Sequence, residues 1–209
     1  MVRLRVRIRF SKQGDLRLIG HRDLMRCFER LFRRAGLALS FSQGFHPKPR
    51  MTFPLALAVG IEGLDEVMEL ELAEELSADE VLQRIAPQAP AGLRFRSAEV
   101  LPEGSRKARV QTASYEAPIP AALETGLGRR IERLWAAPSW PVARDRGRAP
   151  LDLRPLLLEL SLDQGVLRMR LRVDNRGGVG PRDVLRALEL GEIEQQGSRL
   201  RRTAVEVCA

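Results

Sequence analysis

Residues Ser40–Gly60 read SFSQGFHPKPRMTFPLALAVG, a segment that places Gly44 and three prolines around His46. Proline fixes φ and biases the residue before it towards extended backbone, so His46 and Lys48 are expected in a stiff, extended loop. Gly44 allows a sharp turn just before them. A rigid loop with one imidazole beside Lys48 and Arg50 suits an anion or a nucleotide. The ordinary alternative is a proline-rich connection between strands with solvated charges.

The segment before this loop predicts an amphipathic helix over Arg22–Ala35, with Gly36 as its stop. At 100° per residue the apolar positions gather on one side: Leu24, Phe28, Leu31, Phe32 and Ala35. The arginines gather on the other: Arg22, Arg26, Arg30 and Arg33. His21 lies at the start, and Asp23 could serve as N-cap. A core helix with a solvated arginine face is one interpretation, and a basic binding face is the other.

Farther out, two segments alternate with period two. In Val2–Phe10 apolar residues alternate with arginines, which predicts a half-buried strand with an arginine face. In Glu66–Leu72 apolar residues are mixed with Glu69 and Glu71. If these strands are neighbours, Arg5 and Arg7 face the two glutamates, so that the sheet itself neutralises much of the arginine row. The strands also lack the aromatic residues of an RNA-stacking sheet.

The remaining elements of the first half complete a β-α-β-β-α-β order. Short extended pieces are expected at Leu37–Phe41 and Met51–Phe53, a helix at Ala78–Ile85 and a strand at Leu93–Val100. Ser77 and Glu80 form a capping box at the start of the second helix. This order predicts a ferredoxin-like α+β fold with an antiparallel sheet.

The second half repeats the same rhythm after a polar, basic linker, PEGSRKAR. Predicted elements are a strand near Gln111–Ala117, a helix at Ala121–Ala136, an extended piece at Trp140–Asp145, a hairpin of Leu156–Leu162 and Val166–Val173, a helix at Pro181–Leu190 and a strand at Arg201–Val207. The glycine-rich segment Asp174–Gly180 has two interpretations. It is an ordinary loop, or it binds a phosphate through backbone N–H groups ahead of the next helix. We therefore predict tandem ferredoxin-like domains at 1–101 and 111–209, joined by a linker at 102–110.

The charge distribution favours a polyanionic partner near the N-terminus. The 209 residues carry a formal net charge of +8. Residues 1–50 hold 13 basic and 3 acidic residues, whereas residues 51–101 hold 3 basic and 10 acidic residues. Nucleic acid is the expected partner ahead of membrane.

The residue types exclude several classes of chemistry. The two cysteines, Cys27 and Cys208, are far apart, which suits a reducing cytoplasm and excludes a motif of three close cysteines for a radical-generating iron–sulfur cluster. No Cys/His cluster for structural zinc and no P-loop motif occurs. No apolar run is long enough to span a membrane, and the N-terminus is not a signal peptide. We expect no cofactor and no metal.

His21 and His46 are the candidate acid/base groups. Together with Arg50, such a pair could cleave RNA through its 2′-hydroxyl without a metal. This metal-independent endoribonuclease is one alternative function. The sequence alone does not bring the two rings together.

Four motifs run from Gly20 to Glu62: a histidine–acid helix start, an arginine-rich helix ending in RRAGL, S-x-GF-(H/N)-P-x-PR, and PL-x-L-x-VG. In these motifs the chain resembles a bacterial family known as radical-SAM-linked, or radical-SAM-associated, proteins. The resemblance is most specific over residues 2–75, and DLRPLLLEL further on is similar as well. It implies an accessory role beside a cobalamin-binding radical-SAM enzyme, to which some relatives are fused, and it assigns no catalytic residue. Tandem ferredoxin-like halves also resemble CRISPR-type RNA-processing endoribonucleases, at the level of fold only.

Three functions are therefore carried forward. The first is a non-catalytic module that binds tRNA, rRNA or an RNA-associated substrate and presents it to a separate radical-SAM enzyme. The second is the endoribonuclease, and the third is a protein-docking domain without nucleic-acid binding. The predicted anion site of the first consists of Arg22, Arg26, His46, Lys48 and Arg50.

Overall fold

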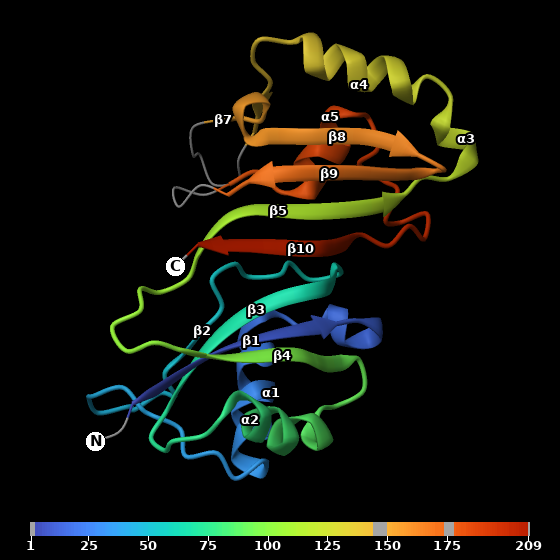
Figure 1. Ribbon diagram of the computed structural model, residues 1–209. Helices are drawn as coiled ribbons and strands as arrows, with labels where there is room; N and C mark the ends of the chain where they lie inside the picture. Colours follow the sequence, from blue (N-terminus) through green and yellow to red (C-terminus); the bar gives the residue numbers. More distant parts are fainter. Residues whose placement is uncertain (1–2, 144–149, 174–177, 209) are drawn as a thin grey trace. The chain divides into compact units, whose positions relative to one another are not determined.

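The computed structural model describes residues 3–143, 150–173 and 178–208 (Figure 1). Three predictions fall partly outside the described residues: Val2 of the first strand, residues 144–145 of the extended piece, and residues 174–177 of the glycine-rich segment. The chain is a mixed α/β protein in which the strands pair mostly antiparallel. Within the described residues, no helix is both long and apolar enough to cross a membrane.

The chain divides into two compact units, which are described separately. The first consists of Met1–Arg109 with Val207–Ala209, and the second of Val110–Glu206.

In the first unit, strands and helices alternate in the predicted order. They are β1 (Leu4–Lys12), α1 (His21–Arg34), β2 (Met51–Thr52), β3 (Glu62–Leu72), α2 (Ala78–Ile85) and β4 (Leu93–Leu101), with 3₁₀ turns at Gly14–Leu18 and Ala86–Gln88. Strand β1 lies between β4 and β3, and the short β2 pairs with β3 on its other side. All three pairings are antiparallel. The predicted neighbours β1 and β3 are thus adjacent.

One face of this sheet is buried against the two helices. Alternate residues of β1 (Val6, Ile8 and Phe10) share a core with Phe28 of α1 and Val81 of α2. Because side chains of a strand point alternately to the two faces, the arginines of β1 occupy the opposite face.

The two helix starts of this unit differ. At α2, Ser77 and Glu80 form the predicted capping box: the Glu80 N–H donates to Ser77 Oγ, and the Ser77 N–H donates to the Glu80 carboxylate. Helix α1, by contrast, begins at His21 with Gly20 as N-cap and no side-chain cap. The prediction of Asp23 as N-cap is wrong, because Asp23 lies inside the first turn.

The second unit has its own strands and helices, and only the ends of its first and last strands, Arg109 and Val207–Cys208, belong to the first unit. Its elements are β5 (Arg109–Pro118), α3 (Ala121–Glu124), α4 (Leu127–Ala136), β6 (Pro141–Val142), β7 (Leu151–Asp152), β8 (Leu157–Asp163), β9 (Val166–Arg172), α5 (Pro181–Ala187) and β10 (Arg201–Cys208), with a 3₁₀ turn at Arg154–Leu156. The sheet order is β10-β5-β9-β8. Strands β8 and β9 form the predicted hairpin, in which Asp163 pairs with Val166 across a two-residue turn.

Three elements of this unit differ from the prediction. The single helix predicted over 121–136 is two helices, because Gly126 adopts a left-handed φ of 76° between them. Helix α5 ends at Ala187 rather than Leu190, and Glu189 takes a positive φ of 62° just beyond it. Strand β7, which pairs with β6, was not predicted.

Candidate nucleic-acid interface

The solvent-facing side of α1 carries a row of arginines, as the helical spacing predicts. The opposite side is buried through Leu24, Phe28, Leu31 and Phe32, which fixes how the helix is turned about its axis. Four exposed arginines form this row: Arg22, Arg26, Arg30 and Arg33. We call these four residues the α1 arginine face.

Only part of this positive charge is neutralised on the helix itself. Arg26 lies 3.4 Å from Asp23, and Arg33 lies 3.0 Å from Glu29, one helical turn away in each case. Such exposed pairs contribute about 0.3–0.5 kcal/mol, so their arginines can exchange partners readily. Within the described residues, Arg22 and Arg30 have no carboxylate at ion-pair distance. The α1 arginine face therefore keeps a net positive charge.

The proline loop is closed at its base by backbone contacts. The Ser42 N–H donates to the Lys48 carbonyl at 2.8 Å, and the Lys48 N–H donates to Ser42 Oγ at 3.0 Å. Next to them, the Arg50 N–H donates to the Ser40 carbonyl at 2.8 Å. Residues 43–48 are exposed to solvent. The loop is thus an ordered turn that presents His46 and Lys48 to water.

The two candidate acid/base histidines have different environments. His21 is half-buried, and its ring packs edge-on against Phe53 with 5.4 Å between centroids. His46 is exposed near the tip of the proline loop. Within the described residues, no contact links the two rings. The structure gives no geometric support for a catalytic pair.

Arg50 does not join the α1 arginine face. Strand β2 pairs Met51 with Leu70, and Met51 is buried in the core beneath α1. Because neighbouring residues of a strand point to opposite faces, Arg50 lies on the face away from the helices. There its Nη1 approaches Glu71 at 3.6 Å, and its Nε donates to the Phe41 carbonyl at 3.1 Å. The predicted five-residue anion site is therefore divided between two faces of the sheet.

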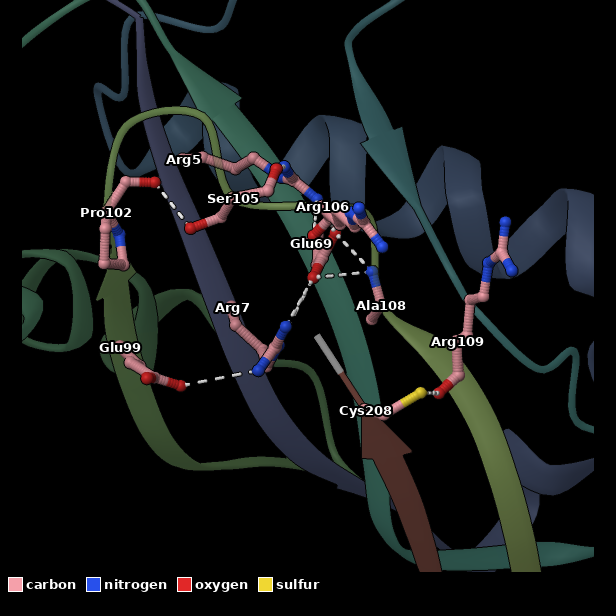
Figure 2. Close-up of polar contacts among 10 residues, drawn as sticks. All are labelled: Arg5, Arg7, Glu69, Glu99, Pro102, Ser105, Arg106, Ala108, Arg109 and Cys208. Carbon is pink, nitrogen blue, oxygen red and sulfur yellow. Dashed lines mark hydrogen bonds and ion pairs between the residues drawn. The ribbon is translucent and has the colours of Figure 1, made fainter.

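The opposite face contains a buried ion cluster centred on Glu69 (Figure 2). Only 3% of the Glu69 side chain is exposed. Arg5 Nη2 lies 2.6 Å from one carboxylate oxygen, Arg7 Nη2 lies 3.0 Å from the other, and the Ala108 N–H donates at 3.3 Å. Both arginines thus converge on one glutamate, instead of pairing with Glu69 and Glu71 separately.

This cluster also anchors the segment that follows β4. Arg5 donates to the carbonyls of Ser105 and Arg106, and Glu69 accepts from Ala108. The polar stretch predicted as a linker is therefore attached to β1 and β3 in its second half. The sequence contains a signal for the Arg–Glu pairs in its alternation, but none for these backbone contacts.

The pKa of Glu69 reflects the balance in this cluster. Burial alone would raise the pKa of the carboxyl group, but hydrogen bonds from Arg5 and Arg7, together with the Ala108 N–H, lower it below its ordinary value. Glu69 is therefore charged at neutral pH. Its charge offsets that of the two arginines.

The other charges of β1 are paired as well. Arg9 forms an ion pair with Asp65, and Arg7 lies 3.7 Å from Glu99 as well as near Glu69. The predicted neutralisation of the arginine strand by its own sheet is confirmed. This face is a poor site for a polyanion.

A hollow of about 820 Å³ lies at the start of β1 and α2. Four glutamates contribute to its lining, against Arg3 and Arg5: Glu71, Glu75, Glu80 and Glu103. This excess of carboxylates disfavours phosphate. Within the described residues, no group of three or more His, Cys, Asp or Glu side chains is arranged to hold a metal ion.

The fold and this surface define a mixed α/β protein with a charge-paired sheet and an unevenly neutralised basic helix. The chain belongs to the family described as "Uncharacterized protein conserved in bacteria (DUF2344)", which matches residues 5–181. No curated protein matches the chain. Among solved structures, it is similar to one titled "Crystal Structure of an Unknown Protein from Galdieria sulphuraria", at 10% identity and a TM-score of 0.30 over 100% of both chains. A similarity of that degree is too low to carry an argument.

Proposed function

We propose that this chain is a non-catalytic accessory module that binds RNA, either tRNA or rRNA, or an RNA-associated substrate. It presents this substrate to a separate, cobalamin-dependent radical-SAM enzyme. The observation that carries the proposal is the α1 arginine face, in which Arg22 and Arg30 have no carboxylate partner within the described residues. Arginines in this state gain most from phosphate, because binding releases the counterions of the nucleic acid.

The length of the arginine face favours a polymer over a small anion. From Arg22 to Arg33 the helix rises roughly 16 Å at 1.5 Å per residue. That distance exceeds the size of one phosphate and corresponds to several phosphates of a nucleic-acid strand. Arginine also presents a planar fork of donors that matches phosphate oxygens.

The fold proposal is that both units are ferredoxin-like βαββαβ domains. It is supported by the strand orders: β1 lies between β3 and β4 in the first unit, and β5 lies between β9 and β10 in the second. The proposed enzyme partner is supported by the sequence motifs between Gly20 and Glu62, and a cytoplasmic location by the two distant cysteines. Neither the endoribonuclease nor the docking domain is favoured by a specific contact.

Crosslinking in cells, followed by sequencing of the bound RNA, tests this function directly. The proposal predicts enrichment of tRNA or rRNA, together with co-purification of a radical-SAM enzyme. The recovered RNA should be intact on a denaturing gel after incubation with the purified chain. Cleaved RNA would favour the endoribonuclease, and the absence of RNA would favour the docking domain.

A further inference from the structure

Phe45 lies at the tip of the proline loop, and its side chain is fully exposed, at 103% of the reference area. It follows Gly44, whose φ of 127° is open to glycine and strained for other residues. Single exposed apolar residues are common on protein surfaces, so exposure alone does not define a site. The geometry of the loop and the charges beside Phe45 supply the further evidence for a binding site.

The backbone of the loop that carries Phe45 is closed at its base. Phe41 and Pro49 form a β-bridge at the base, and two hydrogen bonds join Ser42 to Lys48 above it. The backbone on either side of the tip is thus ordered before any ligand arrives. Binding through a backbone turn that is already closed loses less conformational entropy than binding through an open one.

Phe45 is followed on the loop by an imidazole and a cation, His46 and Lys48. His46 and Lys48 are exposed on the same tip. Between Gly36 and Ile61 the sequence contains no aspartate or glutamate. An aromatic anchor for a protein pocket sits in the centre of an interface, where charged residues are depleted. An aromatic ring beside a lysine, in a segment without acidic residues, suits a ligand that combines a flat π-surface with negative charge.

We propose that Phe45 is a stacking platform for an unpaired RNA base, with Lys48 and His46 beside the flanking phosphates. This inference rests on the proposed function and narrows it to RNA with a single-stranded segment. Bases of a continuous duplex are stacked on one another and cannot reach a side chain on a loop. The α1 arginine face contacts phosphates of either form, so Phe45 is the element that distinguishes them.

The test compares two RNA probes of equal length, each about 12 nucleotides per strand. One is an unstructured single strand with one 2-aminopurine, and the other is its perfect duplex. The variants are Phe45→Ala, Phe45→Leu and Phe45→Trp. Leu18→Ala is the matched control, since Leu18 is also exposed, at 55%, and lies outside the loop.

Phe45→Ala and Phe45→Leu should weaken binding of the single strand about 5- to 150-fold. Binding of the duplex and the salt dependence of both complexes should stay unchanged, because no phosphate contact is lost. Phe45→Trp should retain affinity, and Leu18→Ala should match wild type. The change in 2-aminopurine fluorescence on binding should disappear in the alanine variant.

Different results distinguish a failure of the stacking platform from a failure of the proposed RNA-binding function. If wild type binds neither probe, the proposed function itself fails. If wild type binds RNA and Phe45→Ala binds each probe as tightly as wild type does, only the platform is overturned. Wild-type affinity in Phe45→Leu would also overturn it, because leucine keeps the apolar contact and loses the ring.

Discussion

Strand β1 and helix α1 each carry a row of arginines, but the two rows have different neighbours. On β1, Arg5 and Arg7 are 19% and 13% exposed and converge on the buried Glu69. On α1, Arg26 is 74% exposed, and its partner Asp23 is also at the surface. One row is enclosed by its own counter-charges, and the other faces water.

The difference shows that the number of arginines does not locate a nucleic-acid site. The glutamates opposite β1 come from the acidic segment that follows in the sequence, and strand pairing brings them within ion-pair distance. Helix α1 has no such partner strand beside its arginine face, and the two ion pairs on that face come from residues three or four positions away. Of these two rows, the one with usable positive charge is therefore on α1, although β1 has the more regular pattern.

The largest expected effect is a loss of unfolding free energy when the counter-charge of the β1 arginines is removed. Glu69→Gln leaves Arg5 and Arg7 without their shared counter-charge in a partly buried site. Removing one partner of a buried ion pair costs about 3 kcal/mol or more of unfolding free energy. We expect a loss of about 3 kcal/mol, measured by urea denaturation, with RNA affinity unchanged under native conditions.

Glu99→Gln is the control for this effect. Glu99 is 64% exposed and lies 3.7 Å from Arg7, so its removal should change stability by less than about 0.5 kcal/mol. Equal losses in the two variants would contradict the distinction between a buried and a surface pair. A large loss of RNA affinity in folded Glu69→Gln would indicate that RNA binds the face of the sheet that carries Glu69, and would contradict the proposed site on α1.

The contribution of Glu69 should depend on pH in a defined direction. Its pKa is lowered from 4.5 in the folded chain, so its stabilisation is complete above that pH and is lost as the pH falls through the folded-state pKa. The difference in unfolding free energy between wild type and Glu69→Gln should shrink between about pH 5 and about pH 3. A difference that stays constant over this range would show that the charge of Glu69 has no part in it.

The same cluster should protect the attached segment from proteases. Trypsin cleaves after Arg106 and Lys107, which lie between the contacts of Arg5 and Glu69. Weakening the contacts of Ala108 and Arg5 in Glu69→Gln should increase the rate of cleavage there severalfold, whereas Glu99→Gln should not. Sequencing of the first fragments measures this. Identical rates in all three proteins would mean that the cluster does not restrain the segment.

The smallest effect concerns the α1 row. Glu29→Gln removes the partner of Arg33 and should raise RNA affinity about twofold, at a cost of about 0.3–0.5 kcal/mol in helix stability. Glu132→Gln changes the net charge equally on the exposed surface of α4 and should leave affinity unchanged. Equal gains in both variants would indicate a response to net charge alone.

Local signals predicted much of this fold. The capping box of α2 and the amphipathic face of α1 depend on residues within four positions of one another, and both were predicted correctly. Strand β1 was predicted from the alternation that ends at Phe10, and the strand itself continues through the buried residues Ser11 and Lys12. These elements need no knowledge of the rest of the chain.

The remaining errors arose where distant residues or a single glycine decide the structure. Arg50 was grouped with the helix arginines, because a two-residue strand has no alternation from which its facing can be read. Its face follows from the pairing of Met51 with Leu70. Arg5 and Arg7 share one glutamate because the Ser105–Ala108 stretch folds back onto them. In the second unit, Gly126 interrupts a helix whose apolar spacing continues across it.

The salt dependence of RNA binding tests the central claim that the α1 arginine face contacts RNA. The measurement compares wild type with Arg22→Ala/Arg30→Ala and with Arg94→Ala/Arg96→Ala, which removes two exposed arginines from β4. We predict that the α1 double variant lowers the slope of log K against log salt concentration by about 1.5–2, as expected for two lost phosphate contacts. The β4 double variant should keep the wild-type slope. Equal slopes in all three proteins, or equal reductions in both variants, would contradict the claim.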